Sequence, residues 1–252
     1  MVIKKNWMRS SSFVAIIFFF LTAVFLDAQQ RAKVIVGYHH SIDEQVVQRE
    51  GGAVSHRWDE IKAVAAEVPL GKIGKLRADP NVKYVEPDAE ATTLEIKRSR
   101  APAGGSVETQ AVQTTPWGID RVDADVAWST TTGSGRKVAI IDTGIYYSHP
   151  DLAGNVNKGP TYVKGTKSSN DDNSHGTHVS GTVAAVNNTI GVIGAAWTTK
   201  LWGVKSLDRN GSGSYSSIIS GINWSASNGM HQINMSLGGT FDSQALKDAC
   251  NN

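Results

Sequence analysis

The sequence predicts an α/β protein: part of a doubly wound parallel sheet, preceded by a small α+β unit. From residue 112 onward, apolar runs of strand type alternate with helical patterns, as in proteins built on a parallel sheet. Residues 33–91 hold a separate, shorter series of such patterns. Between the two units, residues 95–111 contain Ala-Pro-Ala-Gly-Gly-Ser, which is typical of a linker.

The smaller unit shows the pattern strand, helix, strand, helix, strand. Lys33–Tyr38 alternates as a strand, and Val82–Val85 is the closing strand. Helical spacing is present at Ile42–Val47 and at Leu70–Leu76. We therefore expect a single strand between the two helices.

The larger unit continues the alternation. Its expected strands are 137–141, 201–204 and 231–235, and its expected helices are 175–186, 215–228 and one that starts near 243. With residue 252 as the end, an interior strand would become an edge, so we expect a marginal, aggregation-prone fragment. Gln232 is unfavourable in an inner strand unless it is paired.

The N-terminus has the features of a secretory signal. Lys4, Lys5 and Arg9 make it basic, and the apolar run Phe13–Leu26 has 14 residues, too short for a comfortable membrane span. We expect residues 1–28 to be a signal peptide cut after Ala28, with a retained anchor as the alternative. The predicted protein is secreted and extracellular, with no stable membrane anchor.

Composition limits the possible partners. The net charge of +2 is too small to indicate nucleic-acid or anionic-membrane binding. Cys250 is the single cysteine, so no internal disulfide can form. Such a secreted protein must be stabilised by its core, or by a metal.

An aspartate and a histidine carry the main chemical signal. Asp142 ends the apolar run Val138–Ile141, and His175 follows 33 residues later at the start of an apolar helical pattern. A carboxylate beside an imidazole fixes the tautomer of the ring and stabilises the imidazolium that forms when the ring accepts a proton from serine. His178, on another side of the helix, is expected to be a packed structural residue.

The flanking motifs resemble the subtilisin family of serine endopeptidases (peptidase S8) from about Val112 to Lys247. They are Asp-Thr-Gly-Ile at 142–145, Ser-His-Pro-Asp-Leu at 148–152, His-Gly-Thr-His-Val-Ser-Gly-Thr at 175–182, Asn-Asn-Thr-Ile-Gly-Val at 187–192 and Ile-Asn-Met-Ser-Leu-Gly-Gly at 233–239. The resemblance implies a subtilisin-like sheet in a catalytic domain at 112–252, with Asp142 and His175 as catalytic residues. Trp197, His231 and Gln232 depart from the usual family pattern.

The third member of the triad is absent from residues 1–252. In the order Asp, His, Ser the serine follows the histidine by about 157 residues, which projects to about position 332. The oxyanion-hole asparagine projects to about 266. Ser236 is rejected as a substitute because the resemblance assigns its segment to substrate binding. We therefore expect this chain to have no peptidase activity.

The resemblance also implies a cleft for protein or peptide substrates. Two extended segments would hold the substrate between them by strand addition, and glycines would allow its backbone to approach closely. The residues implied are Leu207, Gly211, Ser212, Gly213, Tyr215, Ser236, Leu237 and Gly238. A flexible turn is the alternative for 211–213.

A structural Ca²⁺ site is implied as well, because several oxygen ligands with one carboxylate suit this ion better than Zn²⁺. Its ligands would be the side chains of Gln113, Asp151 and Asn188 and the carbonyls of Val186, Ile190 and Val192.

Residues 33–94 resemble the ferredoxin-like inhibitor propeptide (inhibitor I9 type) of secreted subtilisins, and end in Val-Lys-Tyr-Val-Glu-Pro-Asp at 82–88. The propeptide would act as an intramolecular inhibitor and folding template of a monomeric enzyme. Cleavage is expected after Leu94, with the basic cluster Lys97, Arg98 and Arg100 as the alternative.

Two other functions compete with this one. The chain could be a non-catalytic protein whose propeptide-like domain inhibits a protease or acts as a folding chaperone. It could also be a metal hydrolase that uses Asp171, Asp172, His175 and His178, although His-x-x-His spacing is weak for zinc and no general-base Glu is nearby.

Overall fold

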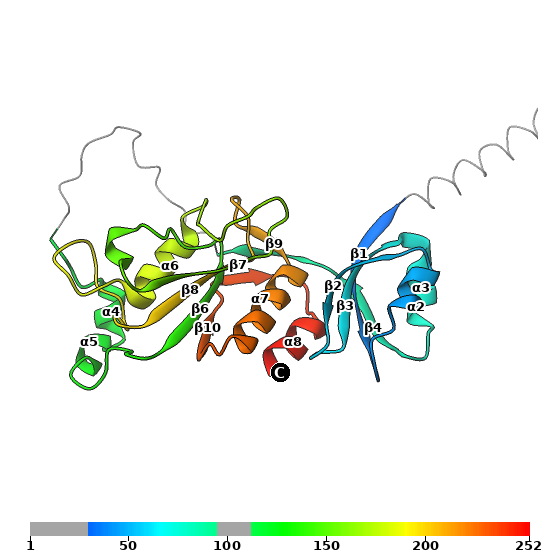
Figure 1. Ribbon diagram of the computed structural model, residues 1–252, viewed down its shortest axis with the longest axis horizontal. Coiled ribbons are helices and arrows are strands. Elements are labelled where there is room, and N and C mark those ends of the chain that lie inside the picture. The colour runs from blue at the N-terminus through cyan, green and yellow to red at the C-terminus, as the bar shows by residue number, and fades with distance from the viewer. Residues whose placement is uncertain (1–29, 95–111) are drawn as a thin grey trace, which may run out of the picture. The chain divides into compact units, whose positions relative to one another are not determined.

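The computed structural model describes residues 30–94 and 112–252. Residues 1–29, with the expected signal peptide, and 95–111, with the expected linker, lie outside the described residues. The chain divides into two compact units after Pro87 (Figure 1). Within the two described ranges, no helix has the length and apolar character needed to cross a membrane.

The first unit is a four-stranded antiparallel sheet with two short helices. Its elements are β1 Arg31–Tyr38, α2 Glu44–Arg49, β2 Ala53–Trp58, β3 Ala63–Pro69, the 3₁₀ helix η1 Leu70–Lys72, α3 Ile73–Arg77 and β4 Val82–Pro87. The strand order is β2-β3-β1-β4. A βαββαβ chain with this order is ferredoxin-like, as expected. The prediction of one strand between the helices was wrong, because β2 and β3 pair there as two strands.

The hydrophobic core of this unit contains the apolar residues whose spacing predicted its strands and helices. Asp43 caps α2 by accepting a hydrogen bond from the backbone N–H of Gln45. The core contains Val34, Val36, Tyr38, Val46, Val47, Val64, Ala66, Val68, Leu76, Val82 and Val85. The strand β2 differs from the other strands, because Trp58 is its only buried residue. Its sequence therefore has little of the apolar alternation by which a strand is recognised.

The second unit contains a parallel four-stranded sheet in the order β10-β6-β8-β7. Its elements are β5 Glu90–Thr93, α4 Trp117–Arg121, α5 Ala124–Ala127, β6 Lys137–Asp142, the 3₁₀ helix η2 Pro150–Leu152, β7 Val156–Thr161, α6 His175–Ala184, β8 Lys200–Lys205, β9 Ser212–Ser214, α7 Tyr215–Ser227, β10 Gln232–Asn234, β11 Leu237–Gly239 and α8 Gln244–Asn251. The predicted strands and helices correspond to β6, β8, β10, α6, α7 and α8. The strand β7 was not predicted.

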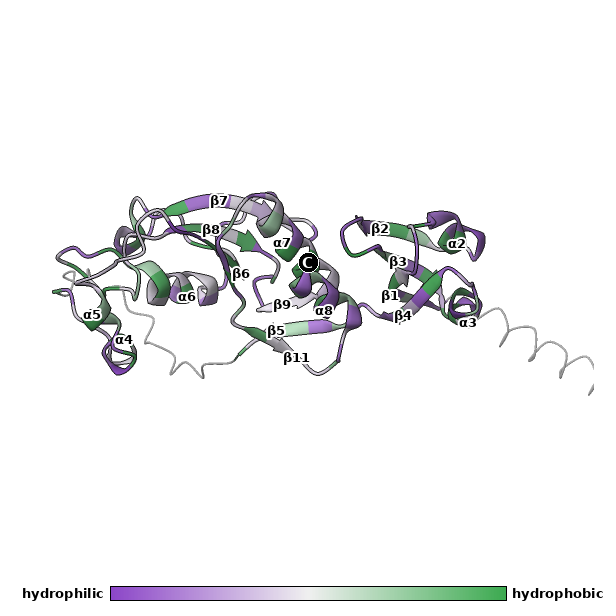
Figure 2. Cartoon of the chain, turned by 90° about the horizontal axis from the view of Figure 1, so that it is seen from below, coloured by the Kyte–Doolittle hydropathy of each residue, from purple (hydrophilic) through white to green (hydrophobic). Residues whose placement is uncertain are grey.

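Helices cover both faces of this sheet, which is the doubly wound arrangement expected from the sequence. Val138 and Ile140 of β6 pack with Ala184 of α6 in one cluster. On the other face, Gly221 of α7 lets that helix approach closely, since a Cβ there would lie 3.2 Å from a side-chain carbon of Ile141. Figure 2 shows hydrophobic residues along β6 and β8, the two central strands.

The strand β10 lies at the edge of the described sheet. Gln232 is exposed there and Ile233 is 37% exposed. Gln232 is therefore not a buried residue of an inner strand, and it needs no partner inside the protein. His231 joins the edge to β6, because its Nδ1 accepts a hydrogen bond from the backbone N–H of Lys137 at 3.0 Å.

Candidate active site

The site begins where β6 and α6 meet. Asp142 is the last residue of β6 and is fully buried, and His175 is the first residue of α6. The Nδ1 atom of His175 lies 2.9 Å from both carboxylate oxygens of Asp142. The carboxylate also accepts a hydrogen bond from the backbone N–H of Thr143 at 2.6 Å. This contact selects the tautomer with the proton on Nδ1 and leaves Nε2 able to accept a proton.

Glycines make this close approach possible. A Cβ on Gly176, next to His175, would lie 2.1 Å from the carbonyl oxygen of Gly144 and 3.2 Å from the Cβ of Asp142. Gly144 itself has φ 104°, a conformation that favours glycine. The helix and the strand can therefore meet only with a glycine at position 176.

Burial raises the pKa of Asp142, and this effect exceeds the opposing hydrogen bonds from His175 and Thr143. The native state therefore binds a proton at Asp142 more readily than the unfolded chain does. The contribution of Asp142 to stability falls as the pH rises through the interval between the unfolded pKa and the higher folded pKa. Ionisation of Asp142 in the folded protein therefore carries a cost in stability.

Asp171 organises the loop that leads into α6. Its Oδ1 accepts hydrogen bonds from the backbone N–H groups of Asn173 and Ser174 and from the Thr143 hydroxyl, each at 2.9 Å. Its Oδ2 accepts from the backbone and the hydroxyl of Thr177. Burial acts to raise the pKa of Asp171, but these hydrogen bonds outweigh it and the pKa lies below its ordinary value. Asp171 thereby joins the start of α6 to the segment that carries Asp142.

Beside this pair lies a second sheet of three short strands in the order β11-β5-β9. The central strand β5 runs antiparallel to both neighbours. Thr92 pairs with Ser212 on one side and with Gly238 on the other, and Thr93 pairs with Leu237. The backbone N–H of Thr93 also donates to the carbonyl of Gly211 at 2.8 Å. The segment 90–93 is therefore held between the two segments that are expected to bind a substrate.

Two side chains, Leu207 and Tyr215, form a wall beside β5. A Cβ on Gly213 would lie 2.8 Å from Leu207 Cδ2, a Cβ on Gly239 would lie 2.9 Å from Tyr215 Cε1, and both glycines pair with Ala91 of β5. Leu207 and Tyr215 are both buried, and the Tyr215 hydroxyl donates to the carbonyl of Phe241 at 2.7 Å. Ala91, on β5, is 1% exposed. Ser236 lies apart from the pairing, since it precedes β11 and its hydroxyl donates to Asn234 at 2.9 Å. Among the described residues, no hydrogen bond joins Ser236 to His175.

The expected calcium ligands are largely brought together. The Gln113 side-chain nitrogen lies 2.7 Å from the carbonyl oxygen of Val186, 3.2 Å from that of Val192 and 3.4 Å from Asn188 Oδ1. Asp151 accepts hydrogen bonds from the Asn188 amide and the Val192 N–H. The backbone N–H of Ile190 also donates a hydrogen bond to Asn188 Oδ1 at 2.7 Å.

Three oxygens thus converge on one amide nitrogen. Rotating the side-chain amide of Gln113 by half a turn would exchange its nitrogen for its oxygen and so bring a fourth oxygen to the same point. Either atom of a glutamine amide can take such a position. A set of carbonyl and amide oxygens with one carboxylate suits a hard cation such as Ca²⁺. Gly191, with φ 62°, lets the loop wrap around Asp151, because a Cβ there would lie 2.4 Å from a carboxylate oxygen. These residues therefore fit the group that the resemblance implies.

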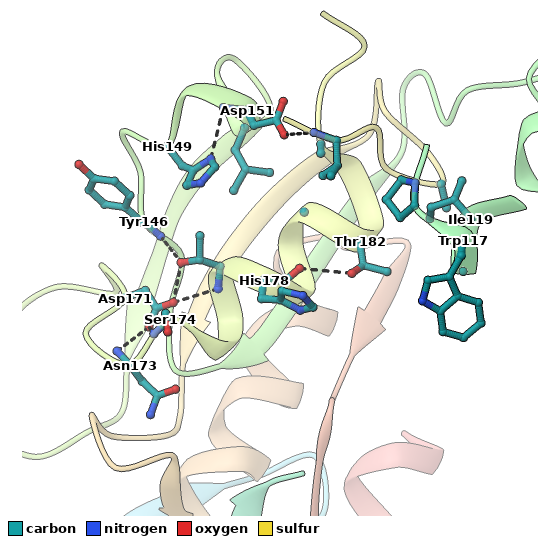
Figure 3. Close-up of a pocket in the computed structure, with 18 of the residues that line it drawn as sticks. Trp117, Ile119, Tyr146, His149, Asp151, Asp171, Asn173, Ser174, His178 and Thr182 are labelled. Carbon is teal, nitrogen blue, oxygen red and sulfur yellow. Dashed lines mark hydrogen bonds between the residues drawn. The ribbon is translucent and has the colours of Figure 1, made fainter. Parts of the chain in front are cut away.

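On the outer side of α6 lies a broad cavity of about 1060 Å³. Trp117 and Ile119 of α4 line it together with His178 and Thr182 of α6 (Figure 3). His178 is exposed, so the expectation that it packs as a structural residue was wrong. Its side chain lines this cavity instead of packing in a core.

The metal-hydrolase alternative receives no support. Across residues 30–94 and 112–252, no group of three or more His, Cys, Asp or Glu side chains could hold a metal ion. Asp171 faces Thr143 and Thr177, and His175 faces Asp142. The acidic and imidazole groups of this alternative are therefore engaged with different partners.

A strand-end aspartate bonded to a helix-start histidine fits two members of an Asp-His-Ser peptidase triad. Comparison with known proteins agrees. The model of the subtilase family, peptidase S8, matches residues 133–252, and that of the fervidolysin N-terminal prodomain matches residues 31–88. The chain therefore carries a subtilase-family domain preceded by a fervidolysin-type prodomain.

Individual relatives point the same way. The chain is 43% identical over 197 residues to M-protease of Shouchella clausii (strain KSM-K16), an alignment that covers 78% of this chain and 47% of that protein. It is 39% identical over 261 residues to subtilisin E of Bacillus subtilis (strain 168), covering 97% and 63% respectively. The crystal structure of fervidolysin from Fervidobacterium pennivorans, a keratinolytic enzyme related to subtilisin, superposes with a TM-score of 0.69 at 25% identity, covering 88% of this chain and 38% of that one. The chain thus spans between about half and two thirds of the length of these curated relatives.

The hydrogen bonds of Asp171 predict a pH-dependent stability. Because its folded pKa is lowered, its contribution is fully present above its ordinary pKa of about 4 and is lost as the pH falls through the folded value. We expect Asp171→Asn to lower the free energy of unfolding by about 1–3 kcal/mol at pH 7 and to flatten its decline below pH 4. Urea unfolding at several pH values measures both effects, with exposed Asp120→Asn as the control. Equal pH dependence in Asp171→Asn and the unmodified chain would contradict this assignment.

Proposed function

We propose that residues 1–252 are the N-terminal part of the precursor of a secreted serine endopeptidase that hydrolyses peptide bonds of proteins through an Asp-His-Ser triad. The observation that carries the proposal is the contact between Asp142 and His175 at 2.9 Å. The similarity to proteins named protease and subtilisin supports the same reaction class.

The residues present would perform two of the three triad roles. His175 Nε2 would take the proton from the serine hydroxyl and later deliver it to the leaving amine. Asp142, held by Thr143 and His175, would keep the ring in the correct tautomer and stabilise the imidazolium. The serine is expected near position 332, so residues 1–252 would bind peptides without cleaving them. Loss of a triad serine lowers turnover by about a millionfold.

The cleft would take its substrate as an added strand, in the position that β5 occupies. Main-chain pairing with β9 and β11 would give affinity, and the wall of Leu207 and Tyr215 would select the side chain that stands at Ala91. The segment 90–94 would be the product side of the cut, with Leu94 as its last residue. In this arrangement the propeptide inhibits its own enzyme until it is removed.

A hybrid protein tests the proposed reaction. Residues 1–252 would be continued by the C-terminal part of subtilisin E that the alignment leaves uncovered. We expect this hybrid to react with a fluorophosphonate probe and to hydrolyse casein, while its His175→Ala form and the 252-residue chain alone do not. A folded hybrid that stays unlabelled, or labelling of the 252-residue chain, would contradict the proposal.

The occupied cleft also favours a second role, in which the N-terminal residues inhibit a protease in trans. We expect a peptide of residues 29–94 to inhibit an intact subtilisin, and a peptide of residues 29–87 to inhibit at least about tenfold more weakly, or ~1.4 kcal/mol. The shorter peptide keeps the core of the first unit and lacks residues 88–94, which comprise β5 and the contacts of Asp88 and Ala89 with α7. It is therefore a matched control for that whole segment. Equal inhibition by the two would show that β5 does not block the cleft.

We propose that Ca²⁺ binds among Gln113, Asp151, Val186, Asn188, Ile190 and Val192. The ion would have a structural role, because its positive charge would hold Gln113 and the loop that follows α6 together. At a Ca²⁺ concentration 100 times its Kd, the added stability is about 2.7 kcal/mol. We expect Ca²⁺ to raise the melting temperature relative to a chelator, and Asp151→Asn to lose most of that increment. Identical melting with Ca²⁺ and with chelator would remove the site.

A further inference from the structure

A lysine is buried beside the candidate active site. Lys205, the last residue of β8, is 1% exposed and is the largest fully buried side chain among the described residues. Its Nζ donates hydrogen bonds to the carbonyl of Thr143 at 2.6 Å, to Asp172 Oδ1 at 2.6 Å and to the carbonyl of Leu207 at 3.1 Å. An ammonium group has three donors, so every one of them is used.

Burial of this charge is unfavourable unless something compensates for it. Asp172 is the one carboxylate bonded to the ammonium, and its side chain is 46% exposed, so the pair is only partly shielded from water. An apolar side chain of similar size often fills such a position with equal or greater stability. The ammonium is therefore better explained by the groups that it holds together than by a contribution to stability.

Each acceptor belongs to a different part of the candidate site. Thr143 directly follows Asp142, and Asp172 lies in the loop that leads into His175. Leu207 forms part of the wall beside β5. The same segment reaches back to the triad strand, because the backbone N–H groups of Ser206 and Leu207 donate to the carbonyl of Asp142 at 3.0 and 3.1 Å. Within residues 30–94 and 112–252, no other side chain bonds all three of these segments.

We propose that Lys205 is a positioning residue that fixes the Asp142–His175 pair relative to the peptide-binding cleft. Its ammonium holds the end of the aspartate strand, the loop before the histidine helix and the cleft wall at a single point. Asp171 performs a narrower task, since it joins the loop and α6 to Thr143 without contacting the cleft wall. The catalytic significance of this arrangement rests on the proposed peptidase function.

The matched pair Lys205→Met and Lys200→Met tests the proposal in the full 252-residue chain. Lys200 begins the same strand, and its Nζ donates to the carbonyl of Gly154 at 2.6 Å and to Asn155 at 3.2 Å, outside the candidate site. In ¹⁵N-labelled protein, NMR follows solvent exchange of the His175 Nδ1 proton and the Leu207 amide proton. The amide proton of Trp202, in the middle of β8, reports on the stability of the sheet as a whole.

We expect Lys205→Met to speed exchange at His175 Nδ1 and at Leu207 by at least about tenfold relative to Trp202. Lys200→Met should leave both ratios unchanged. A purely structural role for Lys205 would alter all three protons in proportion, and that result, or unchanged exchange, would overturn the proposal.

Should Lys205→Met fail to fold, Asp172→Ala provides the second variant, because it removes one of the three acceptors at a half-exposed position. Selectively faster exchange at Leu207 and His175 is again expected, and unchanged ratios would overturn the proposal. These measurements require no cleavage of a substrate. A hybrid enzyme that proves inactive would count against the peptidase function alone.

Discussion

The hydrogen bond between Asp142 and His175 is the interaction on which the rest of the second unit depends. It requires a buried carboxylate at the end of a central strand and an imidazole at the first position of a helix. Burial raises the pKa of that carboxyl group, so the arrangement needs support from its surroundings. The glycine at 176, the loop held by Asp171 and the lysine at 205 each provide part of that support.

The same surroundings form the cleft. The segment after β8 bonds the Asp142 carbonyl and then continues into β9, which pairs with β5. Asp88 and Ala89 extend this pairing to α7, since the Ser216 N–H donates to Asp88 at 2.9 Å and the Tyr215 N–H donates to the carbonyl of Ala89 at 2.8 Å. A peptide strand that occupies the cleft therefore contacts both the recognition strands and the start of a buried helix.

The sequence predicted the two central strands β6 and β8 well because they are apolar, and the helices beside them because they begin at recognisable motifs. It missed β7, in which only Val156 is an apolar aliphatic residue. His175 was placed correctly at the start of α6, and Ser243 proved to be the residue that caps α8. The three-stranded sheet could be expected only from the family resemblance, since strands such as β9 and β11 have three residues and no periodicity. The pairing between β2 and β3 was missed for a similar reason, because β2 lacks an apolar alternation.

The role of Asp171 was missed as well, although an acidic residue just before a helix start is a known signal for hydrogen bonds to free backbone N–H groups. Lys205 carried a weaker signal, as a charge at the end of the strand Lys-Leu-Trp-Gly-Val-Lys. What such a charge bonds to depends on three segments distant in sequence, which no local pattern can reveal. His178 likewise lines a cavity, whereas the helical pattern alone favoured burial.

The most direct test of the central claim is NMR detection of the His175 Nδ1 proton in the 252-residue chain and in its Asp142→Asn variant. The account predicts a hydrogen-bonded, slowly exchanging Nδ1 proton that disappears in the variant while the amide protons of β6 and β8 remain protected. The same Nδ1 signal in both proteins, or its absence from the folded unmodified chain, would contradict a charge-relay pair at this position.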